Sequence, residues 1–171
     1  MTNQTVAGLL NTQINKELYS GYLYLAFANY YTQNGLDGFA NWYTIQAQEE
    51  RDHAMLFIKY MHNNNLEVIL EAIDKPEINF SNNLEPLKAG LEHEQYVTGL
   101  IHTIYNAAFE IKDFRTMQFL DWFVKEQGEE ETNAESLISK MEIFGSDPKG
   151  LYMLNNELGA RIYSPSSLVL D

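Results

Sequence analysis

The sequence predicts an all-α fold, in which a bundle of four long helices is followed by a short fifth helix. Glycine and proline are sparse, at 10 and 4 of 171 residues, and they cluster between helical stretches rather than inside them. Within each stretch, apolar residues recur at alternating spacings of three and four, which is typical of a helix that buries one face. The length and the 45% hydrophobic content suit one packed core, so we expect a single domain over residues 1–171.

Helix-breaking residues give the bounds of each expected helix. Gly35 follows the first helix, asparagines from Asn63 onward end the second, and Gly145 closes the fourth. Asp147 is suited to cap a short fifth helix, with Pro148 in its first turn. The expected helices cover about residues 5–33, 37–62, 83–111, 114–144 and 148–158.

A long connection separates the second and third expected helices. It has about 20 residues and includes Pro76 and the extended-looking residues 77–80. A hairpin between antiparallel helices usually needs only about 2 to 8 residues, whereas a loop of this length can travel along a bundle. We therefore predict two helical hairpins joined by one long crossover, with the second and third helices parallel.

Composition excludes several classes of function. The chain has no cysteine, so any metal must be held by oxygen and imidazole ligands rather than by thiolates. Its net charge of −13 repels phosphate backbones, and we expect no nucleic-acid partner. No stretch reaches the roughly 18 uncharged apolar residues of a membrane span, and the first residues show no leader pattern. The expectation is a cytoplasmic protein without a membrane partner.

Each of the four apolar stripes carries a carboxylate near its middle, at Glu17, Glu50, Glu94 and Glu130. Each helix rises by about 1.5 Å per residue, so the distance of each acid from its turn can be counted. By this count Glu17 and Glu50 lie at the same height along the bundle, and Glu94 and Glu130 also lie level with each other. A lone glutamate on such a stripe often reaches to solvent, but four that converge would repel one another without a bound cation. His53 follows Glu50 by one helical turn, and this mixed oxygen and nitrogen set favours iron, manganese or zinc. The pattern predicts a two-metal site.

The whole chain resembles the bacterial non-haem ferritins, which belong to the ferritin-like helix bundles. A Glu-x-x-His motif alone is weak, but its occurrence in order with the other elements across four helices is specific. The matching elements are Glu17 in Glu-Leu-Tyr-Ser, Tyr24, the run Gln-Glu-Glu-Arg-Asp-His at 48–53, Glu94, and Trp122 followed by Glu-Gln-Gly-Glu-Glu at 126–130.

The resemblance implies a ferroxidase centre with two irons per subunit. Glu17, Glu50 and His53 would hold one iron, and Glu94 and Glu130 would hold the other. Glu50 would bridge the two. The second iron would have no imidazole ligand and should be bound more weakly than the first. This weaker binding favours a centre that oxidised iron leaves for storage.

Three further residues near this centre are implied by the same resemblance. Gln127 stands three residues before Glu130, where other di-iron proteins carry a second Glu-x-x-His, and it is expected among the catalytic and metal-binding residues. Tyr24 and Trp122 match aromatic residues close to the centre. Core packing is the alternative explanation for both aromatics, and a catalytic contribution is expected from Tyr24.

A third iron site is implied at Glu49, Glu126, Glu129 and Glu130. The alternative interpretation is that Glu126 and Glu129 belong to an ordinary solvated helix face. Glu49 lies one residue off the inward stripe of the second helix, which favours the metal-binding interpretation. The remaining histidines, His62, His93 and His102, fall off the inward stripes and are expected at the surface.

The expected function is iron storage. Fe(II) would be oxidised to Fe(III) by O2 or H2O2 and kept as hydrous ferric oxide inside a hollow homo-oligomeric shell of 24 subunits. A haem-containing bacterioferritin would need a methionine directly after the bridging glutamate, where this chain has Arg51, so no haem is expected. A rubrerythrin-like peroxidase and a DNA-protecting mini-ferritin fit less well. The alternative from another class is a helical assembly protein that holds no redox metal.

Overall fold

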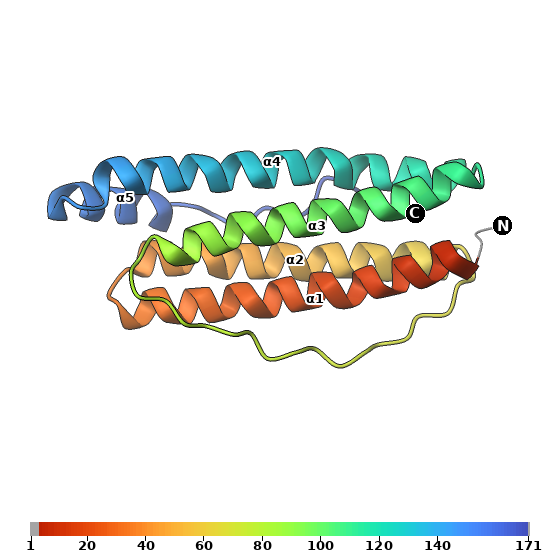
Figure 1. Cartoon of the computed structure of the whole chain (residues 1–171), viewed down its shortest axis with the longest axis horizontal. Coiled ribbons are helices and arrows are strands. Elements are labelled where there is room, and N and C mark those ends of the chain that lie inside the picture. Colours follow the sequence, from red (N-terminus) through yellow and green to blue (C-terminus); the bar gives the residue numbers. More distant parts are fainter. Residues whose placement is uncertain (1–3, 171) are drawn as a thin grey trace.

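The computed structural model describes residues 4–170 and contains helices but no strand in that range (Figure 1). Four long helices form the bundle, and a short fifth follows, as predicted. The bounds differ from the expected ones by at most two residues. The helices are α1 Gln4–Gln33, α2 Asp37–Asn63, α3 Glu85–Glu110, α4 Phe114–Phe144 and α5 Pro148–Gly159.

Local sequence explains where these helices start and stop. Gly35 has φ 72°, a left-handed conformation that glycine adopts without strain, and it closes the turn between α1 and α2. The Asp113 carboxylate accepts a hydrogen bond from the Thr116 backbone N–H and caps α4. Asp147 caps α5 in the same way, with Pro148 in the first turn. The turn between α1 and α2 and the start of α5 therefore lie where the sequence places them.

The crossover, residues 64–84, runs back along the full length of the bundle, so that α2 and α3 are parallel (Figure 1). Polar side chains of α1 hold it in place. The Asn11 amide donates to the Ile69 carbonyl at 3.0 Å and accepts from the Ile69 N–H at 2.8 Å. Asn15 donates to the Ala72 carbonyl at 3.0 Å. The prediction from loop length is confirmed.

The apolar core is divided into two clusters that occupy opposite halves of the bundle. One is rich in aromatic residues such as Phe27 and Tyr31, and the other contains residues such as Phe57 and Phe123. Along every long helix, a band of buried polar residues separates the two. These residues include Glu17, Ser20, Gln46, Glu50, His53, Glu94, Gln127 and Glu130. The level at which the sequence places its carboxylates is thus a polar layer between two apolar ones.

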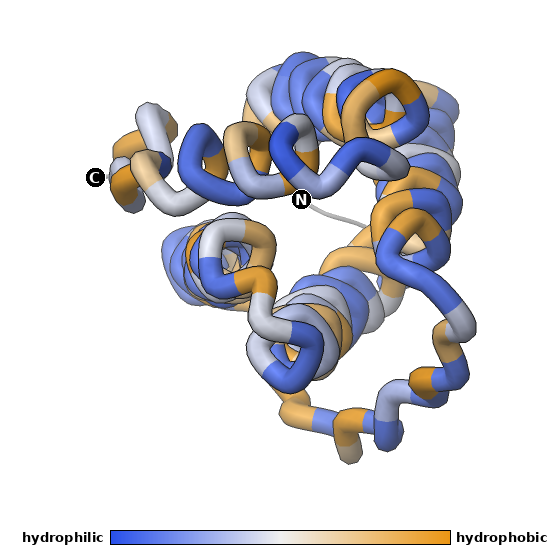
Figure 2. Tube along the Cα trace, turned by 90° about the vertical axis from the view of Figure 1, so that its left-hand side faces the viewer, coloured by the Kyte–Doolittle hydropathy of each residue, from blue (hydrophilic) through white to orange (hydrophobic). Residues whose placement is uncertain are grey.

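The chain returns along α2 and α4 after α5. We call residues 160–170 the C-terminal strap. It lies on the side of the bundle opposite the crossover (Figure 2). Trp122 of α4 donates to the Ser167 hydroxyl at 2.9 Å, and the Lys59 ammonium of α2 donates to the Leu170 carbonyl. None of the described helices is long and apolar enough to cross a membrane.

The contact between α2 and α5 depends on a glycine. A Cβ atom on Gly38 would lie 1.7 Å from the Asn155 carbonyl oxygen, and the Asn155 side chain already accepts from the Gly38 N–H at 2.8 Å. Gly38→Ala should therefore displace α5 and lower the free energy of unfolding by about 1 to 3 kcal/mol, as overpacking does. Thermal unfolding followed by circular dichroism measures this effect.

Gly99→Ala is the matched control for that substitution. Gly99 is also helical, and a Cβ atom there meets nothing within 4 Å. This change should raise stability by about 0.5 to 1 kcal/mol, because alanine loses less backbone entropy in a helix. Equal shifts in melting temperature for the two variants would show that the Gly38 contact does not hold α5.

Candidate metal centre

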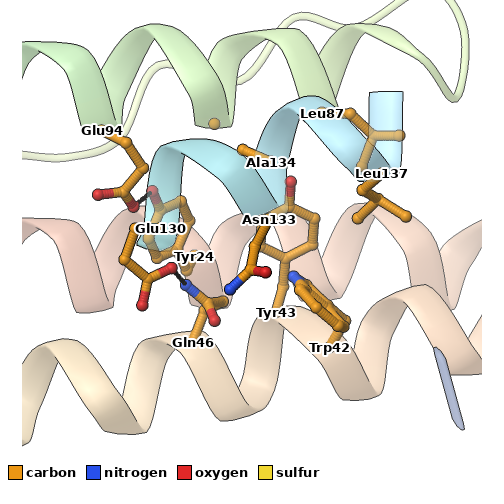
Figure 3. Close-up of a pocket in the computed structure, with 11 residues that line it drawn as sticks. Tyr24, Trp42, Tyr43, Gln46, Leu87, Glu94, Glu130, Asn133, Ala134 and Leu137 are labelled. Carbon is orange, nitrogen blue, oxygen red and sulfur yellow. Dashed lines mark hydrogen bonds between the residues drawn. The ribbon is translucent and has the colours of Figure 1, made fainter. Parts of the chain in front are cut away.

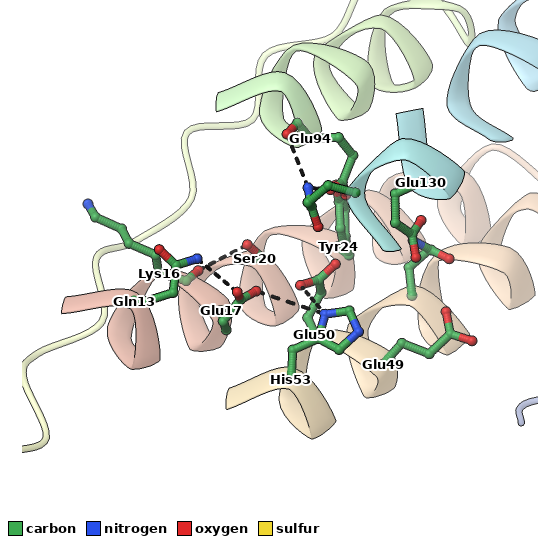
Figure 4. Close-up of polar contacts among 12 residues, drawn as sticks. Gln13, Lys16, Glu17, Ser20, Tyr24, Glu49, Glu50, His53, Glu94 and Glu130 are labelled. Atoms are coloured by element: carbon green, nitrogen blue, oxygen red, sulfur yellow. Dashed lines mark hydrogen bonds and ion pairs between the residues drawn. The ribbon is translucent and has the colours of Figure 1, made fainter. Parts of the chain in front are cut away.

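Glu17 of α1 and Glu50 and His53 of α2 converge inside the polar layer (Figure 4). One ligand atom from each residue lies within 4.8 Å of the other two. His53 Nδ1 is 3.4 Å from Glu50 Oε2 and 4.0 Å from Glu17 Oε2. All three side chains are almost completely buried, with at most 3% of their surface exposed. Among the described residues, this group is the only cluster of three or more carboxylate and imidazole ligands in such proximity.

Two of these buried ligand atoms have no hydrogen-bond partner among the described residues. They are Glu17 Oε2 and His53 Nδ1, which face each other across the group. A buried polar atom without a partner costs about 1 to 3 kcal/mol, and native proteins contain few of them. The other Glu17 oxygen is satisfied, because Gln13 donates to Oε1 at 2.8 Å. The arrangement leaves one oxygen and one ring nitrogen free to bind a cation.

Glu94 of α3 and Glu130 of α4 complete the set of buried acids from all four long helices. Gln127 donates to Glu94 Oε2 at 3.1 Å. The Tyr24 hydroxyl donates to Glu94 Oε1, as Figure 3 shows. Gln46 donates to Glu130 Oε2 at 2.8 Å. These two acids lie outside the closest group of three and are each oriented by amide or phenol donors. Figure 4 shows them on the far side of Glu50 from Glu17.

The glutamines Gln13 and Gln46 are site residues that the sequence did not assign. Each fixes one oxygen of a buried glutamate and leaves the other available. Gln46 lies on the inward stripe of α2, one helical turn before Glu50, which was a usable signal. Gln13 lies one turn before Glu17, so its position also follows from helical spacing.

Burial raises the pKa values of all four acids. For Glu17 and Glu50 the pKa lies well above its usual range, because burial disfavours the charge and neighbouring carboxylates add repulsion. Burial raises the pKa of Glu94 too, although the hydrogen bonds from Tyr24 and Gln127 oppose the shift. Burial, with repulsion from Glu94, raises the pKa of Glu130 to about 7. Without a cation, the centre is therefore held partly protonated.

These shifts predict how the stability of the metal-free protein depends on pH. Because the folded pKa values exceed the unfolded ones, the folded state binds more protons, and stability must fall as pH rises through this range. For Glu130, a rise from 4.5 to about 7 corresponds to a loss on the order of 3 kcal/mol. The melting temperature of the metal-free protein should fall between about pH 5 and pH 8.

A divalent cation should remove much of this dependence, since it replaces the protons. The stabilisation by added Zn(II), measured by differential scanning calorimetry, should therefore be larger at about pH 8 than at about pH 5. A stabilisation by Zn(II) that is independent of pH would contradict carboxylate binding at the centre.

The two aromatic residues that the resemblance places near the centre both adjoin it. The Trp122 and His53 rings are 5.6 Å apart in an edge-to-face arrangement, and Phe123 lies 5.7 Å from the same imidazole. Tyr24 is buried, and its ring lies 5.4 Å from that of Tyr43. A cavity of 20 Å³, room for about one water molecule, is lined by Tyr24, Tyr43, Glu94, Glu130 and several apolar residues (Figure 3).

The residues expected at a third iron site are only partly brought together. Glu49 and Glu126 line the same cavity of 240 Å³ beside His53. Glu49 also forms an ion pair with Arg161 of the strap, with 2.7 Å between Oε2 and Nη2. Glu129 is exposed and pairs with Lys125 at 3.3 Å. Glu130 is oriented by Gln46 at the main centre, so this third group is less assembled than the first.

His93 is not a surface residue, contrary to the expectation from its position off the stripe. It is half-buried, and its Nε2 lies 2.7 Å from the Ser20 hydroxyl of α1. Burial, with the charge of Lys16, lowers the pKa of His93 to about 4, so the imidazole is neutral near pH 7. The expectation failed because the neighbouring α1 covers this side of α3. His62 and His102 are exposed, as expected.

Comparisons with known proteins identify the family. Residues 7–144 match the family described as the ferritin-like domain. The bacterial non-haem ferritin of Campylobacter jejuni is 37% identical over 90% of this chain and 92% of that protein, and that of Staphylococcus saprophyticus is 37% identical over 97% and 99%. Among solved structures, the open-pore ferritin of the archaeon Archaeoglobus fulgidus superposes with a TM-score of 0.93 at 38% identity, covering 95% of this chain and 100% of that one. The chain belongs to the ferritin family and is similar throughout its length to the bacterial non-haem ferritins.

Proposed function

We propose that this protein oxidises Fe(II) to Fe(III) at a centre for two irons and stores the product as hydrous ferric oxide. The observation that carries the proposal is the convergence of Glu17, Glu50 and His53, in which one carboxylate oxygen and one ring nitrogen are buried without a hydrogen-bond partner. In the proposed centre these three residues hold one iron, and Glu94 and Glu130 hold the second. Iron is the substrate and the stored cargo.

Charge balance supports two cations rather than one. Four carboxylates are buried within one polar layer, and burial together with mutual repulsion raises their pKa values. Two divalent ions would compensate four negative charges. Glu50 is the residue suited to bridge them, since it lies in the group with Glu17 and His53 and experiences repulsion from Glu94.

The chemistry follows from holding two irons close together. Each Fe(II) gives up one electron, and the pair reduces H2O2 with two protons to two water molecules, or O2 with two protons to H2O2. The chain contributes oriented ligands: Gln13 fixes Glu17, Gln46 fixes Glu130, and Tyr24 and Gln127 fix Glu94. Preset ligands of this kind reduce the rearrangement that metal binding requires.

Storage requires an assembly, which we propose to be a shell of 24 copies of this chain. Support comes from the match to ferritins along the chain and from exposed apolar side chains that a monomer would leave in water. Tyr152 and Met153 of α5 are 65% and 62% exposed, and Phe109 and Phe114 beside the turn between α3 and α4 are 64% and 69% exposed. These positions are suited to contacts between subunits.

The test of storage is size-exclusion chromatography after metal-free protein receives about 100 Fe(II) per chain in air. Ferric iron should elute with a large assembly, at far more than the two atoms per chain that the proposed centre holds. Oxidation at the rate of protein-free buffer, with iron eluting apart from the protein, would instead favour a helical assembly protein without a redox role. Rapid oxidation without co-elution of iron and protein would support the ferroxidase activity and contradict storage in a shell.

A further inference from the structure

Arg161, the second residue of the C-terminal strap, is fixed from three directions. Its Nη2 lies 2.7 Å from Glu49 Oε2, its Nη1 donates to the Trp42 carbonyl at 3.4 Å, and its guanidinium stacks 4.1 Å from the Trp42 ring centre. The Arg161 and Glu49 side chains are each only 20% exposed. A planar guanidinium suits both the carboxylate and the aromatic face, so this ion pair is better ordered than a typical surface pair.

Other strap contacts lie on the same side of the bundle. The Tyr163 hydroxyl donates to Asp52 at 2.5 Å, and Trp122 donates to Ser167 at 2.9 Å. Asn41 of α2 donates to the Arg161 carbonyl at 3.1 Å. The strap is thus bound to α2 and α4 on both sides of the level at which Glu49 lies.

A cavity of 240 Å³ lies beneath the strap, with room for several water molecules. It is lined by Glu49, Asp52, Trp122 and Glu126 of the helices and by residues 164–167 of the strap. His53 also lines the cavity, although the same imidazole belongs to the candidate metal centre. The cavity therefore adjoins the centre from the side that the strap covers.

We propose that the strap is a lock on this cavity, with Arg161 acting as an internal cation that occupies Glu49. A metal ion binds to Glu49 and Glu126 only when Arg161 leaves, because the guanidinium already occupies Oε2 of Glu49 and neutralises its charge. The departure of Arg161 frees the first part of the strap and opens the cavity next to His53. This inference rests on the proposed function, since it makes Arg161 the residue that decides when iron can occupy the third site that the sequence predicts at Glu49 and Glu126.

The coupling must be reciprocal. If strap closure weakens metal binding at Glu49 by some factor, metal binding weakens strap closure by the same factor. The alternative is that Arg161 only anchors the chain after α5 to Trp42 and Glu49. The two interpretations differ in what happens to metal affinity when the guanidinium is removed.

The experiment titrates the assembled metal-free protein with Zn(II), which cannot be oxidised, and counts binding sites by isothermal titration calorimetry. We expect two tight sites per chain and a weaker third in the wild type. Arg161→Gln should tighten the third site by about tenfold or more, the effect of removing a competing ion pair worth about 1.4 kcal/mol. Glu49→Gln should abolish the third site, with or without Arg161.

Arg51→Gln is the matched control. It makes the same chemical change at a residue of α2. The Arg51 side chain is 68% exposed, and its Nη1 is 3.9 Å from Asp52 Oδ1, so it forms only a long surface ion pair. It should leave the third site unchanged. Arg161→Lys, which keeps the charge but loses the planar contacts, should fall between wild type and Arg161→Gln, and it replaces that variant if the latter does not assemble.

Tryptophan fluorescence supplies a second readout that follows the strap itself. The chain has two tryptophans, and both contact the strap. Trp42 stacks against Arg161, and Trp122 donates a hydrogen bond to Ser167, so the emission of both depends on the position of the strap. In the wild type, emission should change as the third Zn(II) binds, and in Arg161→Gln this change should occur at lower Zn(II) concentration.

A third-site affinity in Arg161→Gln within twofold of wild type would overturn the lock and leave Arg161 as an anchor. Zn(II) binding at the third site without any change in fluorescence would overturn it as well. If the wild type showed no tight Zn(II) sites, the result would count against the proposed two-iron centre instead. The failures of the two proposals are therefore distinguishable.

Discussion

Replacing Glu50 and His53 together by alanine is expected to lower the initial rate of Fe(II) oxidation on the order of 100-fold, equivalent to about 2.7 kcal/mol in activation free energy. The double change removes two of the three converging ligands, including the proposed bridge, and leaves Glu17 unable to hold an iron alone. Stopped-flow absorbance of ferric species, after mixing with two Fe(II) per chain in air, measures the rate.

The control for this experiment changes the same residue types outside the site. Glu135 and His102 are both exposed on the bundle surface, and their double alanine variant should oxidise iron at the wild-type rate. Circular dichroism should show unchanged helix content in both variants. If the Glu50 and His53 variant kept more than about a tenth of the wild-type rate, these residues would not be ligands of the ferroxidase centre.

Glu50→Gln is expected to change stability and activity in opposite directions. Glutamine keeps the shape of glutamate but carries no charge, so the metal-free protein avoids the repulsion from Glu94 and the burial cost that raise the pKa of Glu50. At about pH 8 its melting temperature should rise by several degrees, since about 1 kcal/mol corresponds to roughly 2 to 4 °C in a chain of this size. Fe(II) oxidation should fall at least about tenfold, because a bridging carboxylate is lost.

The pH dependence of this stabilisation separates electrostatics from packing. Near pH 4 the wild-type carboxyl is protonated in the folded state and mostly protonated in the unfolded chain, so the two proteins should melt at similar temperatures. A lower melting temperature for Glu50→Gln at about pH 8 would mean that the buried charge is stabilised by the chain itself. In that case no cation would be needed to explain the site.

Helical periodicity explains why so much of the centre was predictable. In a helix, spacing fixes the face on which a side chain lies, and the rise per residue fixes its level. Glu17 and Glu50 lie on two helices that are joined by a short turn, so counting residues from Gly35 was enough to place them at the same level. The parallel arrangement of α2 and α3 followed from the length of the crossover, since no short hairpin needs about 20 residues.

The contacts that sequence could not supply depend on irregular chain or on how helices rotate against each other. The Arg161 and Glu49 pair joins residues 112 positions apart, and the path of the strap after α5 follows no periodic rule. His93 illustrates the second case, because the stripe of α3 does not reveal that Ser20 of α1 covers it. Gln46 could have been assigned, since a buried amide on an acid-bearing stripe needs a partner.

Anomalous X-ray diffraction at the iron edge tests the two-iron centre most directly. Crystals of metal-free protein would be soaked in Fe(II) without oxygen and measured above and below the absorption edge. Two peaks are predicted within the polar layer, one among Glu17, Glu50 and His53 and the other beside Glu94 and Glu130. Iron peaks confined to the exposed acids, with none among Glu17, Glu50 and His53, would contradict the proposed ferroxidase centre.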